Sequence, residues 1–360
     1  MYAWCSQFVI SVLVGRHRNA FCVVRPPGHH AGVKGLLAGG ESCGFCIFNN
    51  VAAGALHAIS DERLMCQRCA IVDIDVHHGN GTEEIVKRCH DPGKLLFFSI
   101  HLHDNEKRKN GYSFYPGTGD EDDIAHNIIN VPIAPMWREQ VQSPTGSVSS
   151  HNTRHKAKRK AEESGPAGSI VNDDTSEAGA VSTAELPETI DTESESASMK
   201  GSAHGSTAQS SAKSPRTQAA SMGRAAYRRA IQNRLLPSLR AFNPDLILIS
   251  TGFDAAKGDV GNARHFAAGK ERMGLDLEPE DYAWTTRKIL EIADICCQGR
   301  VVSVLEGGYG RSPVMPPPGA LGGSNSLDKA FFSECAIRHL HAMIDPYDTE
   351  SRFGRDRGTS

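Results

Sequence analysis

Five short runs of apolar residues constrain the fold of this chain most strongly. They span residues 20–24, 70–75, 95–100, 246–250 and 301–305, and they are apolar almost throughout rather than alternating with polar residues. Such runs are typical of strands in a parallel sheet that is covered on both faces. Helical spacing occurs between and after them, over residues 50–59, 225–242, 280–297 and 328–344. The alternation predicts an α/β fold, in which ligands bind at the carboxyl ends of the strands.

A segment of biased composition interrupts this pattern. Residues 142–222 are mostly Ser, Ala, Thr, Gly, Glu and Lys, and no aromatic residue occurs between Trp137 and Tyr227. Such a segment buries too little apolar surface to offset the entropy lost on ordering, so we expect it to be disordered. Because core patterns lie on both sides, we interpret it as an insertion in a single domain that spans residues 1–360. We expect residues 346–360 to form a flexible tail.

The overall composition argues against several classes of protein. The 360 residues include 39 Lys and Arg and 42 Asp and Glu, and this net charge of −3 disfavours binding of nucleic acid through bulk electrostatics. No apolar run approaches the roughly 18 residues of a membrane-spanning helix, and the apolar stretch 8–14 lacks the basic leader and cleavage site of a signal peptide. The 10 cysteines are scattered, which predicts reduced thiols rather than a disulfide framework.

Acidic and histidine side chains accompany the second predicted strand, in the sequence DIDVHHGNGT. Asp73, Asp75 and His77 alternate, so they point to one side of an extended chain, and Asp75 and His77 can converge on one cation. A catalytic zinc ion usually takes three protein ligands, and Asp254, after the fourth predicted strand, offers the third. Two other interpretations stay open. The acidic and histidine side chains of DIDVHHGNGT can form a hydrogen-bonded cluster without a metal ion, and Asp254 can cap a following helix.

Two further groups follow other predicted strands. His29 and His30 come after a Pro-Pro-Gly turn, and adjacent histidines cannot both point into a core, so at least one faces solvent, a metal ion or a substrate. A second metal site and a structural pair are the alternatives. Tyr309 lies in a glycine turn at the end of the last predicted strand, where a phenol can donate to a developing oxyanion. A tyrosine taken singly more often serves packing.

In combination, these segments resemble the histone deacetylase family and its arginase/deacetylase fold. The motifs occur in the family's order: RPPGHHA, GFCIFNN, DIDVHHGNGT, FYPGTGD, STGFDAAKGD and VLEGGY. Asn80 stands where class I enzymes have aspartate, so the chain is most similar to class II. The resemblance covers residues 10–140 and 223–345. It implies a three-layer αβα domain with a mostly parallel central sheet.

The resemblance assigns catalytic roles to individual side chains. The implied zinc ligands are Asp75, His77 and Asp254. His29 and His30 would stand beside the reacting water, with Asp73 orienting His29 and Asn80 orienting His30. Tyr309 would donate to the oxyanion.

Two further sets of residues are implied by the same resemblance. One set lines the tunnel for the acyl-lysine stem and comprises Gly44, Phe45, Tyr115 (or Phe114 in its place) and Gly307. The other set binds a structural monovalent cation, K⁺, and comprises Asp73, Asp75, His77, Ser99 and Ile100.

The implied activity is hydrolysis of N6-acetyl-lysine, in histones or other proteins, to lysine and acetate. Zinc would activate water and polarise the amide carbonyl, while His30 would take and return a proton and His29 would tune the local charge. Zinc and Tyr309 would stabilise the oxyanion. The resemblance also implies corepressor-type protein partners, a role in chromatin and transcription regulation, and a location in the nucleus or cytoplasm. It implies neither sequence-specific contact with nucleic acid nor association with a membrane.

Two other functions stay open. An acetylpolyamine deacetylase would share the chemistry, but it carries an acidic residue at the tunnel mouth, where this chain aligns Gly261, so protein substrates are favoured. An inactive module that binds partner proteins is the second alternative. Few residues precede His29 compared with the family, so we expect the domain to be incomplete at its N-terminus.

Two local patterns have competing interpretations. Cys43, Cys46, Cys66 and Cys69 have the paired spacing of a structural zinc site, but buried reduced thiols are the preferred interpretation. The basic cluster 154–160 in the insertion is equally consistent with a nuclear localisation signal and with a charge run in a disordered loop.

Overall fold

The computed structural model describes residues 2–104, 114–136, 222–262, 264–267, 270–272, 274–312 and 326–348. Residues 1–143 and 213–360 belong to one compact unit, and the described residues all lie in it. The predicted insertion 142–222 lies outside the described residues except for Met222, which is buried and pairs with Ala134. The basic cluster 154–160 and most of the predicted tail, from residue 349 on, also lie outside them.

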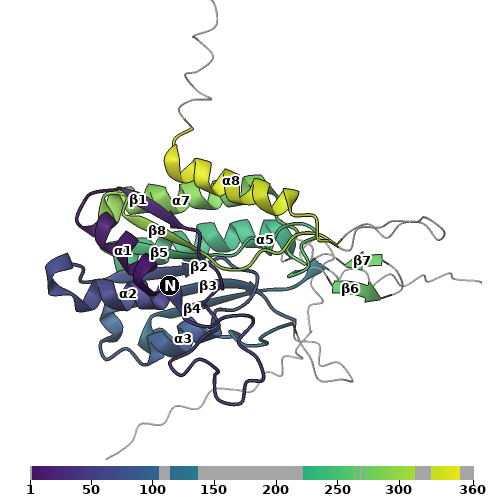
Figure 1. Ribbon diagram of the computed structural model, residues 1–360, viewed down its shortest axis with the longest axis horizontal. Helices are drawn as coiled ribbons and strands as arrows, with labels where there is room; N and C mark the ends of the chain where they lie inside the picture. The colour runs from purple at the N-terminus through teal and green to yellow at the C-terminus, as the bar shows by residue number, and fades with distance from the viewer. Residues whose placement is uncertain are drawn as a thin grey trace, which may run out of the picture. The chain divides into compact units, whose positions relative to one another are not determined.

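A six-stranded sheet forms the centre of this unit (Figure 1). Its strands, in sheet order, are β1 (Asn19–Cys22), β8 (Val301–Leu305), β5 (Leu246–Thr251), β2 (Cys69–Asp73), β3 (Leu95–Leu102) and β4 (Ile128–Ile133). Every neighbouring pair in it is parallel. All five predicted strands are present. The sequence did not indicate β4, whose apolar run is broken by Asn130 and Pro132; proline is tolerated there because β4 is an edge strand.

Helices cover both faces of the sheet (Figure 1). One layer consists of α1 (Tyr2–Leu13), α2 (Asn50–Ser60) and α3 (Asn80–Lys87). The other consists of α5 (Gly223–Ala230), the π-helical turn η5 (Ile231–Leu235), α6 (Leu236–Phe242), α7 (Pro279–Cys297) and α8 (Ala330–Ile344). The remaining elements are short: η1 (Glu62–Leu64), η2 (Pro92–Lys94), η3 (Ile124–His126) and a hairpin of β6 (Arg264–Ala267) and β7 (Lys270–Arg272).

The strands are mostly apolar rather than alternating because they contribute side chains to two cores. In β2, Ala70 and Val72 pack into the core beneath α5, α7 and α8, whereas Cys69 and Ile71 pack into the core beneath α1 and α2. A strand with only one buried face would alternate apolar and polar residues. The three-layer αβα architecture expected from the sequence is therefore confirmed.

Two further features bear on the expectations from composition. None of the described helices is both long and apolar enough to cross a membrane. All 10 cysteines lie in the described residues and carry free thiols. Cys43 and Cys46 lie in the loop before α2, whereas Cys66 and Cys69 lie at the start of β2. Among the described residues these four do not form a common metal-binding group, so the structure does not support a structural zinc site.

Candidate metal centre and its pocket

The predicted functional side chains meet at the carboxyl edge of the sheet. Asp75 and His77 follow β2, and Asp254 follows β5. The tandem histidines follow β1, and Tyr309 follows β8. Because β1, β8, β5 and β2 are parallel and end within one residue of one another in register, the loops that follow them share one side of the sheet.

Asp75, His77 and Asp254 form a compact group of potential metal ligands. One ligand atom from each lies within 4.8 Å of the other two. His77 Nδ1 is 3.0 Å from Asp75 Oδ1 and 3.1 Å from Asp254 Oδ2. Burial opposes a charge on the imidazole, but hydrogen bonds to the carboxylates outweigh it and raise the pKa of His77 to about 9. A bound divalent cation would take the place of that proton.

The surroundings of the two carboxylates fit a metal ion. Asp254 Oδ2 is buried beside the His77 ring, with Nδ1 at 3.1 Å, and Oδ1 accepts a hydrogen bond from the Val76 amide at 3.1 Å. Gly307 N donates to Asp75 Oδ2 at 2.8 Å. A Cβ atom at Gly307 would lie 2.2 Å from Asp254 Oδ2, so the backbone packs directly against the cluster. Two carboxylates and one imidazole are a ligand set suited to zinc with an open coordination position.

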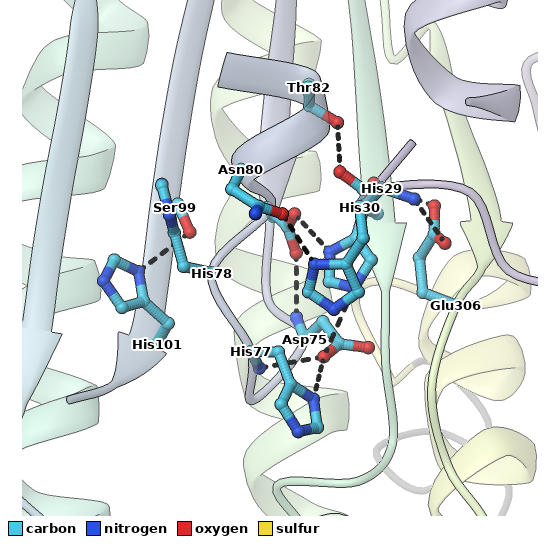
Figure 2. A network of polar contacts seen from close by, with 12 residues as sticks. His29, His30, Asp75, His77, His78, Asn80, Thr82, Ser99, His101 and Glu306 are labelled. Carbon is cyan, nitrogen blue, oxygen red and sulfur yellow. Dashed lines mark hydrogen bonds and ion pairs between the residues drawn. The ribbon is translucent and has the colours of Figure 1, made fainter. Parts of the chain in front are cut away.

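The tandem histidines lie beside this group, and the centroids of their rings are 4.0 Å apart (Figure 2). A hydrogen-bond partner fixes the ring of each histidine. His29 Nδ1 is 2.9 Å from Asp73 Oδ2, and His30 Nδ1 is 2.8 Å from Asn80 Oδ1. Since a carboxylate and an amide oxygen only accept hydrogen bonds, both Nδ1 atoms carry a proton, and His30 keeps Nε2 free as a base.

The two histidines have opposite electrostatic environments. Burial disfavours charge on His29, but the carboxylates of Asp73 and Asp75 outweigh burial and raise its pKa well above the usual value. For His30, burial and the positive charges of His29 and His77 lower the pKa well below the usual value. The pair thus combines a cationic imidazole with a neutral one.

A cavity of about 230 Å³ opens over the metal-binding group. It is lined by His30, Ser42, Gly44, Phe45, His77, Tyr115 and Tyr309. Gly44 fits between two rings, because a Cβ atom there would lie 2.4 Å from His30 Cδ2 and 2.9 Å from Tyr115 Cε1. The hydroxyl of Tyr115 donates a hydrogen bond to Ser42 O at 2.9 Å, which joins two residues of the cavity wall. The exposed Phe45 side chain contacts the Tyr309 ring edge to face, at 5.9 Å between centroids.

Tyr309 keeps its proton in this environment. Burial, followed by the negative charges of Asp254 and Asp75, raises the pKa of its phenol. A protonated phenol that lines this cavity can donate a hydrogen bond to a bound substrate.

Three residues of the predicted tunnel and its mouth take other positions. Gly307 does not line the cavity; it is buried, with its amide bonded to Asp75. Phe114 stacks on His77 at 4.9 Å and 7°, outside the lining, which leaves Tyr115 as the wall residue. Gly261 is also absent from the lining, and its amide donates to a neighbouring carboxylate.

Two of the residues expected to bind a monovalent cation, Asp75 and His77, belong to the metal-binding group itself. Asp73 and Ser99 are adjacent in register in β2 and β3. The Ser99 hydroxyl is 2.9 Å from His101 Nδ1, while His101 Nε2 is 3.1 Å from Gly119 O and therefore carries that ring's proton. Ser99 thus donates its hydroxyl proton to His101 and keeps its lone pairs free. A cation at this position stays a prediction.

Two buried carboxylates of the site were not predicted. Glu306 binds the backbone of the histidine loop, and burial raises its pKa to about 7. Asp259 Oδ2 accepts hydrogen bonds from Tyr309 N at 3.0 Å and Gly310 N at 2.7 Å, and burial raises its pKa to about 7. Both lie in the motifs VLEGGY and STGFDAAKGD, which is the signal that could have identified them.

Comparisons with known proteins assign the family. The histone deacetylase domain matches residues 3–148 and 184–315. Type-2 histone deacetylase 2 of Dictyostelium discoideum is 31% identical over 350 residues, which cover 95% of this chain and 13% of that protein. Histone deacetylase 15 of Arabidopsis thaliana is 28% identical over 311 residues, which cover 85% of this chain and 35% of that protein. The chain belongs to the histone deacetylase family.

A solved structure shows the same fold. The crystal structure of the HDA15 HD domain aligns with a TM-score of 0.53 and 24% identity, over 96% of this chain and 62% of that chain. The chain therefore spans well under half the length of these curated relatives and less than two thirds of the domain in that structure.

Proposed function

We propose that this chain is a zinc-dependent lysine deacetylase that hydrolyses N6-acetyl-lysine of proteins to lysine and acetate. One observation carries the proposal. Asp75, His77 and Asp254 bring three ligand atoms within 4.8 Å of one another next to a cavity walled by histidine and aromatic rings. The buried carboxylates of Asp75 and Asp254, both close to the His77 ring, support a cation there, because buried negative charges are costly unless they are paired or bind a metal ion.

The chain's own residues would carry the proton transfers. A bound zinc ion would supply Lewis acidity, lowering the pKa of water and polarising the amide carbonyl. His30, held by Asn80 with Nε2 free, would accept the proton of the attacking water and return it to the leaving amine. The positive charge on His29 favours the negative charge that develops beside it. Tyr309 would donate its hydroxyl to the oxyanion.

The shape of the cavity supports an acyl-lysine substrate. The methylene stem of lysine favours apolar walls, and Phe45 and Tyr115 supply aromatic rings around the cavity. Protein lysines are the proposed substrates, since the chain carries no acidic residue in the described lining of the cavity. Corepressor-type partners, a structural K⁺ ion and a nuclear or cytoplasmic location belong to the same proposal.

Turnover of an acetyl-lysine peptide with and without a chelator tests the proposal. We expect chelation to abolish acetate release and added zinc to restore it. Asp254→Ala is expected to lose zinc and activity together. Tyr309→Phe is expected to keep zinc and lose about 10²- to 10³-fold in kcat, the usual effect of removing one oxyanion donor.

Three outcomes would contradict this function. A folded, zinc-loaded protein that releases no acetate would instead be a binding module. Acetylpolyamine turnover without peptide turnover would assign the other substrate class. A Tyr309→Phe variant with the wild-type rate would remove Tyr309 from the mechanism.

A further inference from the structure

Glu306 is a fully buried carboxylate beside the backbone of the tandem histidines (Figure 2). Its Oε2 atom accepts hydrogen bonds from the amides of Gly28 at 2.6 Å and His29 at 3.2 Å. Its Oε1 atom accepts the Ser250 hydroxyl at 3.1 Å. All three partners donate, so both oxygen atoms of the carboxyl group act as hydrogen-bond acceptors.

These bonds join three segments of the site. Glu306 follows β8, Ser250 belongs to β5, and Gly28 and His29 belong to the loop after β1. The backbone of Glu306 adds a further tie, because its carbonyl accepts a bond from Arg25 Nη1 at 2.6 Å. The loop that carries the histidines is thus bonded to the end of β8 by one side chain and one carbonyl group.

The contacts argue against a metal-ligand role for this carboxylate. Glu306, His29 and Cys46 do bring ligand atoms within 4.8 Å of one another. However, both oxygen atoms of Glu306 are already bonded to protein donors, and Cys46 Sγ accepts the His30 amide at 3.4 Å. Burial raises the pKa of the Cys46 thiol, so the thiolate that a metal ion needs is disfavoured.

We propose that Glu306 is a positioning residue that holds the Gly28–His29 backbone, and with it the two imidazoles, at their distance from the metal ligands. This proposal rests on the proposed deacetylase function. A buried carboxylate costs free energy unless it is fully bonded, and here the bonds go to the backbone that carries the proposed base. His29 and His30 have their own ring partners in Asp73 and Asn80, so Glu306 acts on the main chain rather than on ring orientation.

Three variants separate positioning from general stability. Glu306→Ala leaves the two amides unpaired, Glu306→Gln retains an acceptor for them, and Ser250→Ala removes only the third donor. We expect Glu306→Ala to lower kcat by about 10²-fold, the effect of displacing a catalytic group by about 1 Å, with KM and zinc content unchanged. The kcat of Glu306→Gln should be at least about tenfold higher than that of Glu306→Ala, which corresponds to the free energy of one hydrogen bond. Ser250→Ala should keep the wild-type kcat.

Crystal structures of the zinc-loaded wild-type protein and Glu306→Ala supply a readout that does not depend on turnover. The proposal predicts that the Gly28–His30 loop moves while Asp75, His77 and Asp254 do not. An unmoved loop would overturn it, as would wild-type kcat in Glu306→Ala or loss of zinc from both Glu306 variants. Absence of turnover in the zinc-loaded wild-type protein would instead reject the deacetylase function, and the loop position would still decide the role of Glu306.

Discussion

Gly307 is a residue at which the backbone packs against both proposed metal-binding carboxylates. Its amide donates to Asp75 Oδ2, and its Cα hydrogens face Asp254. The two contacts require a residue without a side chain, because a methyl group would occupy the space of a carboxylate oxygen. The glycine therefore belongs to the metal centre although it offers no ligand.

Gly307→Ala tests this requirement. The added Cβ would lie 2.2 Å from Asp254 Oδ2 and 2.6 Å from Asp75 Oδ2, so one carboxylate has to move and zinc affinity should fall by at least about tenfold. Competition with a fluorescent zinc chelator measures the affinity. Gly93→Ala is the control, because its Cβ would meet only Asp91 Oδ1, at 3.2 Å. Equal zinc affinity in the two variants would contradict the requirement.

Asp259→Ala tests how the proposed oxyanion donor is held. The Asp259 carboxylate binds the amides of Tyr309, Gly310 and Gly261, so its loss should free the Tyr309 turn. We expect kcat to fall by about 10²-fold with zinc content unchanged, since a donor displaced by about 1 Å loses most of its effect. Steady-state kinetics with metal analysis measures both quantities. A kcat equal to that of the wild-type protein would show that the turn holds its shape without Asp259.

The grouping of Asp75, His77 and Asp254 was predictable from the sequence, whereas the two supporting carboxylates were not. Asp75 and His77 alternate after an apolar run, and that short-range pattern marks one side of a chain. Glu306 and Asp259 instead bind backbone amides of loops distant in the sequence, and such bonds leave no spacing signature. Their roles emerge only when the loops are placed side by side.

Among the elements, the buried strands and long helices were the most predictable. The apolar pattern predicted one helix over 225–242, and the structure continues from α5 through a π-helical turn into α6. Pro237 lacks an amide hydrogen, and the helix widens just before it. The helix α1 was not predicted, although Cys5, Val9 and Val12 are buried at helical spacing. The helix α3 was also missed, because its first residues were interpreted only as a ligand-bearing turn.

Asn49 links α2 to the histidine loop. Its Oδ1 atom caps α2 by accepting the Ala52 amide at 3.0 Å, and its Nδ2 atom donates to Ala31 O and Thr82 Oγ1, each at 3.0 Å. Asn49→Ala should lower the free energy of unfolding by about 2–4 kcal/mol, from a lost cap and two buried bonds. Asn49→Ser keeps a capping oxygen and should lose about half as much. Urea unfolding measures both, and equal losses would show that the cap contributes nothing.

At the scale of the whole molecule, the fold assembles the site from loops that follow four parallel strands. Each loop carried a recognisable motif, and the parallel sheet predicted that the motifs share one edge. The distances between them depend on register, such as Asp73 beside Ser99 and Ser250, which no local pattern encodes. The segment 142–222 lacks the residues that build a core, and the insertion that this composition predicts stays a prediction because all but Met222 lies outside the described residues.

His339 of α8 forms a hydrogen bond with Ser303 of β8, and it should make the free energy of unfolding depend on pH. It is fully buried, with Nδ1 2.7 Å from Thr286 Oγ1 and Nε2 2.9 Å from Ser303 Oγ. Burial lowers its pKa to about 3, whereas an unfolded histidine has a pKa of about 6.5. Between these two pKa values the unfolded chain binds one more proton than the folded protein. The contribution of neutral His339 to the free energy of unfolding is therefore complete above pH 6.5. It is lost as the pH falls towards 3, by about 1.4 kcal/mol per pH unit.

Urea unfolding of wild-type protein and His339→Leu over this pH range measures the contribution. A chelator is present throughout, so that release of metal does not contribute to the pH dependence. We expect the wild-type curve to fall more steeply with acid than the variant curve. Parallel curves would contradict the assignment of a neutral, buried His339.

Anomalous diffraction at the zinc absorption edge, from crystals of the purified protein, tests the central claim most directly. We expect one zinc peak between the carboxylates of Asp75 and Asp254 and the ring of His77, and none in crystals of Asp254→Ala. A protein that cleaves acetyl-lysine while its zinc lies elsewhere, or while this position stays empty, would contradict the account.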